Sequence, residues 1–169
     1  MQSRNSWQIQ QAVLHALFIR ELKTRFGGFR LGVFWAIAEP VSHILVLTIL
    51  FSLMANRAGF FGVPFALFFA SGVLSFFIFQ KVVIVSINSI KSNMGLFAYR
   101  QVKPFDAVVV RAIIELLVII SVMIFLTWLG AWFFEFDCLP NDPLYIILII
   151  LVLFLMGIGL GFFAAVIGV

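Results

Sequence analysis

The fold is decided by residues 144–169, which read LYIILIILVLFLMGIGLGFFAAVIGV and contain no charged side chain. An α-helix rises about 1.5 Å per residue, so this run is long enough to cross the hydrocarbon layer of a bilayer, which is roughly 30 Å thick. We therefore predict a membrane-spanning helix here and look for others in the preceding sequence.

The composition of the whole chain points the same way. Of its 169 residues, 64% are hydrophobic and 11% are charged, whereas soluble domains are roughly half apolar and about a quarter charged. A soluble domain of this size cannot bury that much apolar surface in one core. The fold class that we predict is an all-α membrane protein, with an N-terminal amphipathic helix and four transmembrane helices.

Three more apolar runs predict the other spans. They cover about 33–54, 60–79 and 107–134, so the transmembrane domain is expected at 33–169. Asp106 can cap the third of these spans by accepting backbone N–H bonds. A short polar break between the first two runs indicates a helical hairpin.

Residues 1–32 are expected to form a separate N-terminal helix. Ser6 can cap its start and Gly27 can stop it. One side of a helical wheel carries Trp7, Leu14, Phe18 and Leu22, together with Gln11 and Arg25. Because this amphipathic pattern is imperfect, an interfacial position and an ordinary cytoplasmic position both stay open.

The basic residues indicate membrane orientation. The net charge is +4, but the lysines and arginines sit in short segments between apolar runs, so we expect no nucleic-acid partner. The N-terminal segment holds five of them and the segment 86–106 holds three, whereas the other two loops contain only Arg57. The positive-inside rule therefore predicts a multi-pass protein with a cytoplasmic N-terminus.

Residues 86–104 are too polar for the bilayer centre but keep several apolar side chains. We expect a cytoplasmic loop that contains a short helix on or beneath the membrane surface. Its candidate docking residues are Lys91, Asn93, Leu96, Phe97, Tyr99, Arg100 and Lys103. The alternative is that the loop only rests on anionic headgroups, where each basic residue contributes about 1 kcal/mol.

Two stretches carry a specific resemblance. Residues 20–40 read RELKTRFGGFRLGVFWAIAEP, and residues 93–106 read NMGLFAYRQVKPFD and lead to Arg111 and Glu115. Together they resemble the permeases of capsular polysaccharide ABC exporters, the polysialic acid and group 2 capsule branch of the ABC-2 type transporters. The resemblance extends over essentially the whole chain.

The resemblance implies a function and a set of partners. It implies a homodimeric permease of the bacterial inner membrane that sits on two copies of an ABC ATPase and exports a lipid-linked polysaccharide, with periplasmic and outer-membrane export proteins as further partners. The loop 86–104 would then couple the permease to the ATPase. The family pattern has six spans, so we expect this sequence, with four, to be truncated.

The sequence itself offers no route to ATP hydrolysis. It contains no G-x-x-x-x-G-K-[ST] phosphate loop. We therefore expect a transport subunit that is not an enzyme and has no catalytic residue, metal site or cofactor of its own. ATP and Mg²⁺ would bind to the partner ATPase.

Two pairs of ionisable residues fall inside the predicted spans. Glu39 and His43 are four residues apart beside Pro40, and we expect a hydrogen bond between them rather than a hinge or a polar contact at the channel entrance. Arg111 and Glu115 repeat this spacing, and we expect a structural ion pair. The alternative for Arg111 is attraction of a lipid phosphate or an acidic sugar.

Two further patterns lie on spans two and four. Aromatic residues crowd one broad side of span two, where they either stack on sugar rings in a channel or, as we favour, pack against lipid and other helices: Phe65, Phe68, Phe69, Phe76 and Phe79. Gly157, Gly161 and Ala165 are spaced by four residues and predict the close approach of another helix.

Two alternatives to capsule export stay open at this point. One is a permease for O-antigen or teichoic-acid-type polymers, which the lipid attached to the polymer would distinguish. The other is a truncated, non-transporting membrane scaffold that still dimerises or recruits the ATPase.

Overall fold

The computed structural model describes residues 6–27, 32–54, 65–98, 102–134 and 142–167. Over these ranges it is helical and contains no strand, which confirms the predicted all-α class. The elements are α1 (Ser6–Phe26), α2 (Gly32–Met54), α3 (Phe65–Asn93), the 3₁₀ helix η1 (Met94–Leu96), α4 (Pro104–Phe134) and α5 (Pro143–Ile167). Helices α2 to α5 are long enough and apolar enough to cross a membrane.

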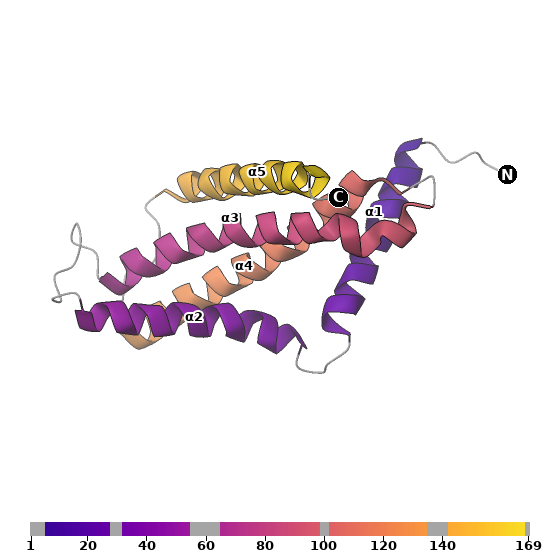
Figure 1. Ribbon diagram of the computed structural model, residues 1–169. Helices are drawn as coiled ribbons and strands as arrows, with labels where there is room; N and C mark the ends of the chain where they lie inside the picture. The colour runs from indigo at the N-terminus through magenta and orange to yellow at the C-terminus, as the bar shows by residue number, and fades with distance from the viewer. Residues whose placement is uncertain (1–5, 28–31, 55–64, 99–101, 135–141, 168–169) are drawn as a thin grey trace.

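The four long helices lie side by side, and α1 lies at a steep angle across one end of them (Figure 1). Helix α3 packs against α5 on one side and against α2 and α4 on the other. The end that carries α1 is the one where α2 and α4 begin and α3 and α5 end. The end of α3 and the start of α4 therefore lie at the same end of the bundle as α1.

The centre of the bundle is an apolar cluster formed by three helices. Its buried members are Val41 and Ile44 from α2, Leu74 and Ile78 from α3, and Ile119 and Val122 from α4. Helix α5 adds the partly buried Ile150 and Leu153 at the edge of this cluster. Helix α2 continues through Pro40, as membrane helices tolerate when neighbouring helices support the backbone.

Helix α5 approaches α3 closely because its contact side has almost no side chains. Its buried residues are Gly157, Gly161 and Ala165. A Cβ atom added at Gly161 would lie 2.5 Å from the Cβ of Ser86 and 3.0 Å from the carbonyl oxygen of Val83. The predicted packing role of the small-residue pattern is confirmed.

Helix α3 extends much further than the sequence indicated. The span expected to end at residue 79 continues as one helix to Asn93, so residues 86–93 of the expected loop are helical. Three small polar residues of this stretch, Ser86, Ser89 and Asn93, fall on the buried side of α3 in register with Val82 and Ile90, whereas Asn88, Lys91 and Ser92 are exposed. Polarity alone was therefore a misleading sign that the span ends at residue 79.

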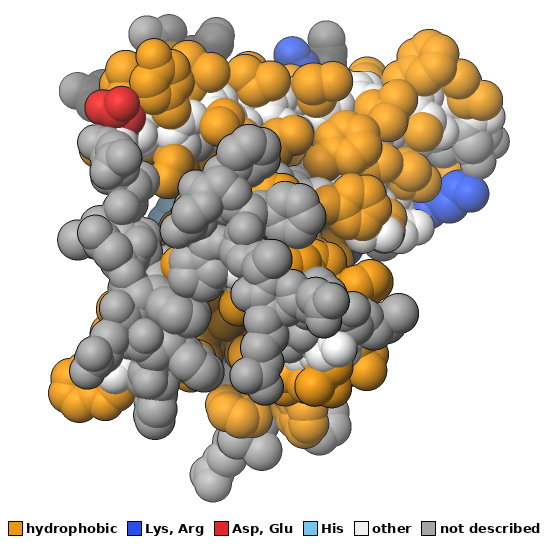
Figure 2. All heavy atoms as spheres, turned by 90° about the vertical axis from the view of Figure 1, so that its left-hand side faces the viewer, with side chains coloured by type: hydrophobic (Ala, Val, Ile, Leu, Met, Phe, Trp, Pro, Cys, Tyr) orange, Lys and Arg blue, Asp and Glu red, His pale blue; other side chains and the backbone are white. Residues whose placement is uncertain are grey.

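The outer surface of the bundle is apolar. Figure 2 looks at the end where α2 ends and α3 begins, and hydrophobic side chains dominate the described part of this view. Helix α5 is exposed along most of its length, including Leu148, Leu155 and Phe163. Such a surface is stable in lipid and unstable in water.

The α3–α5 contact predicts the effect of a single methyl group. Gly161→Ala should lower the stability of the detergent-solubilised protein by about 1–3 kcal/mol, because the new Cβ forces the two helices apart. The thermal unfolding midpoint of the purified protein would measure this effect.

Gly159→Ala is the matched control, since a Cβ at Gly159 meets nothing within 4 Å and the same helix gains the same methyl group. Equal midpoints for the two variants would contradict the close packing of α5 on α3.

Candidate functional site

Helix α1 is attached to the bundle by an apolar contact at its middle. Leu17 is buried against Val110 and Ile114 of α4, and Leu14, Phe18, Leu22 and Phe26 pack around them. The predicted apolar side of α1 is therefore correct for Leu14, Phe18 and Leu22, but Trp7 is 68% exposed and Leu17 was missed. Helix α1 ends at Phe26, directly before Gly27, where the sequence predicted the stop.

Two ion pairs join the second half of α1 to α4. Arg111 Nε lies 2.7 Å from Glu21 Oε1, and Arg25 Nη1 lies 2.5 Å from Glu115 Oε2. The expected pair between Arg111 and Glu115 is wrong. Each of them instead binds an oppositely charged residue of α1, because α1 presents Glu21 and Arg25 with the same four-residue spacing and the opposite order of charge.

Two further polar contacts, one from each half of α1, tie this helix to buried groups. Gln10 Nε2 donates to Asp106 Oδ1 at 2.7 Å, and Arg20 donates to the side-chain oxygen of Asn93. Asp106 and Asn93 are only 4% and 2% exposed. Both also bond to residues close to them in sequence, since Asp106 accepts the Lys103 N–H at 3.2 Å and Asn93 donates to the Ser89 carbonyl at 2.8 Å.

Asp106 accepts a backbone N–H at the start of α4, as the sequence predicted, but it lies inside the first turn and not before a helix that starts at residue 107. Helix α4 begins at Pro104, so Asp106 is in its first turn and its carboxylate accepts the N–H of the residue before the helix. This is the side-chain half of a capping box, with proline at the first helical position. The Asp106 carboxylate therefore binds both the Lys103 N–H and the Gln10 side chain.

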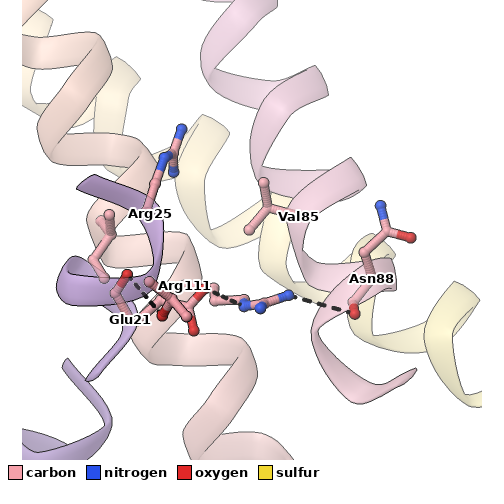
Figure 3. Close-up of a pocket in the computed structure, with 7 residues that line it drawn as sticks. Glu21, Arg25, Val85, Asn88 and Arg111 are labelled. Atoms are coloured by element: carbon pink, nitrogen blue, oxygen red, sulfur yellow. Dashed lines mark hydrogen bonds and ion pairs between the residues drawn. The ribbon is translucent and has the colours of Figure 1, made fainter. Parts of the chain in front are cut away.

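An open cleft of about 330 Å³ lies where α1, α3 and α4 meet. It is lined by Glu21, Thr24 and Arg25 of α1, Val85 and Asn88 of α3, and Arg111 and Ile114 of α4. Figure 3 shows the Arg111 side chain extending between Glu21 and Asn88, whose carbonyl oxygen lies 3.5 Å from Nη1. Arg111 thus contacts both other helices of the cleft.

The residues of the predicted coupling loop separate into two groups. Asn93 is buried, Leu96 packs into the Leu17 cluster, and Phe97 packs against Ile90, Val108 and Ala165. Lys91 and Lys103 are exposed. Tyr99 and Arg100 lie outside the described residues. Met94, which the sequence did not single out, is 52% exposed on the same segment.

The other predicted intramembrane pair does not form. Glu39 and His43 are both exposed on α2, and among the described residues no hydrogen bond or ion pair joins their side chains. The backbone carbonyl of Glu39 accepts a bond from the Ser42 hydroxyl at 2.8 Å. Both residues lie within the membrane-spanning part of α2, Phe34–Phe51.

Some phenylalanines of the predicted aromatic side of span two pack against other rings, and others are exposed. Phe69 is half-buried between Phe65, at a ring distance of 5.8 Å, and Phe51 of α2, at 5.0 Å. Phe68 and Phe76 are about half exposed, and Phe79 is half-buried. Phe69 therefore has the helix-packing role that we favoured, and the sugar-stacking alternative is limited to the exposed rings.

Helix α1 holds the site residues that sequence reasoning missed. Gln10, Arg20, Glu21 and Arg25 all make polar contacts with the bundle. The order of charge in Glu21 and Arg25 is the reverse of that in Arg111 and Glu115. This pattern could have identified Glu21 and Arg25 from the sequence. Nothing in the local sequence pointed to Gln10 or Arg20.

The ion pair between Arg25 and Glu115 predicts the effect of a double mutation. Arg25→Gln leaves Glu115 buried and without its cation, so stability should fall by on the order of 1–2 kcal/mol, less than for a fully buried pair because Arg25 is one-third exposed. Adding Glu115→Gln should restore much of the loss. Thermal unfolding of the purified variants measures both changes.

Lys23→Gln removes an exposed cation from the same helix and serves as the control. A double variant that is less stable than Arg25→Gln would show that Glu115 does not depend on Arg25.

The profile of the ABC-2 type transporter family matches residues 12–169. The polysialic acid transport protein KpsM of Escherichia coli is 36% identical over 169 residues, which cover 98% of this chain and 64% of that protein.

Two capsule export proteins match at lower identity. The capsule polysaccharide export inner-membrane protein CtrC of Neisseria meningitidis serogroup B is 27% identical over 92% of this chain and 58% of its own length. BexB of Haemophilus influenzae, which carries the same description, is 24% identical over 93% and 59%. The chain thus spans somewhat less than two thirds of these relatives. Its all-helical bundle and its match along almost its whole length place this chain in the ABC-2 type transporter family.

Proposed function

We propose that this chain is the permease part of an ABC exporter that moves lipid-linked capsular polysaccharide across the bacterial inner membrane. The observation that carries the proposal is the 36% identity to a polysialic acid transport protein over 98% of the chain. The apolar bundle supports a membrane position, and the relatives include proteins described as inner-membrane proteins of capsule export.

The energy for transport would come from a separate ABC ATPase, which binds the ATP and Mg²⁺. Its docking surface would include Lys91, Met94 and Lys103, which are exposed where α3 ends and α4 begins. This end also carries α1 and most of the basic residues, so we assign it to the cytoplasm together with the N-terminus. A mixed apolar and basic surface suits contact with a protein at the membrane boundary.

The exposed side of α2 supports assembly with a second copy of the permease. Glu39, Ser42 and His43 are exposed there, within a helix that spans the membrane. A charged side chain at the bilayer centre costs at least about 2.5 kcal/mol. This side of α2 would therefore face a second permease or the water-filled path between two permeases, through which the polymer moves toward periplasmic and outer-membrane export proteins.

A cysteine on this side of α2 should report on its surroundings. Ser42→Cys, in a Cys138→Ser background, should react in membranes with a charged maleimide or form a disulfide with a second copy, because thiols react as thiolates in water. Leu155→Cys is the control, since Leu155 is exposed on the apolar side of α5. If neither cysteine reacts with the maleimide and neither forms a disulfide, this side of α2 faces lipid, which would contradict the assembly.

Gene deletion tests the proposed function directly. Removing the gene from a capsulated host should cause polymer to accumulate inside spheroplasts and disappear from the cell surface, and the native reading frame should restore the surface polymer. The fractionated polymer measures this effect. Unchanged surface polymer after deletion would overturn the capsule assignment, and polymer synthesis in the deletion strain is the control that the precursor is still made.

A further inference from the structure

Lys81 is a cation within the membrane-spanning part of α3, Phe65–Ser92. It is partly buried, and its ammonium nitrogen lies over the ring of Phe77, 5.7 Å from the ring centroid. No carboxylate among the described residues forms an ion pair with it, whereas Arg25 and Arg111 each bind a glutamate. The partner that the structure shows for Lys81 is therefore an aromatic ring and not an anion.

The side chain of Lys81 leads away from the end of the bundle that carries α1. Helix α3 ends there at Asn93, and Phe77 lies one turn further from that end than Lys81 does. Helical side chains lean toward the N-terminus of their helix, and the ammonium group of Lys81 follows this direction. The start of α3 at Phe65 is about 24 Å away along the helix. The ammonium group is thus directed toward the interior of the span and not toward the nearer lipid headgroups.

An ionised lysine in a membrane-spanning helix needs compensation for the water that it loses. Such residues face the interior of a bundle or a water-filled cavity, and they mark the paths of substrates and ions. A cation–π contact such as the one with Phe77 compensates only part of the lost hydration. The rest must come from water or from an anion that reaches Lys81.

The open cleft between α1, α3 and α4 lies on the same side of α3 as Lys81. Val85 and Asn88 line this cleft (Figure 3). They follow Lys81 by four and seven residues, a spacing that keeps side chains on one side of a helix. Polar groups that enter the cleft therefore approach Lys81 along one side of α3.

The neighbourhood of Lys81 also offers exposed aromatic surface. The Phe76 ring lies 6.5 Å from the Phe77 ring, and Phe76 is 56% exposed. An aromatic face packs against the C–H groups of a sugar ring, and an ammonium group forms a charge-assisted hydrogen bond with a carboxylate. These are the two contacts that a carboxylated sugar needs. A lipid phosphate would instead require Lys81 to point toward the headgroups.

We propose that Lys81 and the rings of Phe76 and Phe77 form a contact site for carboxylated sugar units of the polymer during its passage across the membrane. The ammonium group binds the carboxylate, and the sugar rings pass over the phenylalanines. The proposal rests on the export function proposed above and names an acidic polymer as the substrate class. It accounts for a lysine inside α3 to which the described residues supply no carboxylate.

Photo-crosslinking tests the contact itself. Benzoylphenylalanine replaces Phe76 in the native reading frame of the permease, which is expressed with its ATPase in a host that makes an acidic capsule. Irradiation should attach polymer to the permease, and an antibody against the polymer detects the product. Leu155, exposed on the apolar side of α5, carries the same probe as the control and should capture lipid. Equal capture of polymer from both positions, or capture of lipid alone from position 76, overturns the proposal.

Charge variants test Lys81 in a gene-deletion strain. Lys81→Gln should lower surface polymer at least about tenfold, because it removes a hydrogen bond to a charged group. Lys81→Arg keeps the positive charge and should export like the parent, as should the control Lys23→Gln, which removes an exposed cation from α1. Lys81→Gln and Lys81→Arg should have the same thermal unfolding midpoint, which a purely structural role of the charge would not allow.

The outcomes separate this site from the export function. If the parental chain does not restore surface polymer in the deletion strain, the export function and this site are both wrong. If the parental chain exports and Lys81→Gln exports equally well, the export function stands and the site is overturned. If Lys81→Gln does not accumulate in membranes, the crosslink from position 76 in the chain that keeps Lys81 decides the question.

Discussion

Glu115 is a carboxylate with 2% of its side chain exposed, in a helix whose neighbours are almost all apolar. A buried charge without a partner destabilises a protein by several kcal/mol, so the fold must supply a cation. The nearest candidate in sequence, Arg111, is already bound to Glu21. The cation comes instead from Arg25, which means that the position of α1 is set by the charges of α4 and not only by the burial of Leu17.

The membrane-spanning helices could be predicted because lipid imposes a local requirement. A chain segment in the bilayer must be long, apolar and internally hydrogen-bonded, and each of these properties is readable within one window of sequence. The same reasoning failed at Ser86, Ser89 and Asn93, because polarity was taken as a sign that the second span had already ended. Their spacing of three and four residues, in register with Val82 and Ile90, was the better guide, since small polar residues are common where membrane helices pack.

The candidate site was only partly predictable, and the reason is geometric. Residues four apart on a helix are always neighbours, so Arg111 and Glu115 were an acceptable pair whatever lay beside them. Whether they bind each other depends on a second helix far away in sequence. For Gln10 and Arg20 the partners Asp106 and Asn93 are 96 and 73 residues distant, and no periodicity of a single helix encodes such contacts.

The two kinds of contact in this bundle differ in how easily they can be rearranged. Helix α5 meets α3 through glycines with no spare volume, so any relative shift produces overlap of hard atoms. Helix α1 is held by the Leu17 cluster and by side chains of arginine, glutamate and glutamine, which are long and can adopt other rotamers. A shift of α5 against α3 therefore meets more resistance than a shift of α1 against α4.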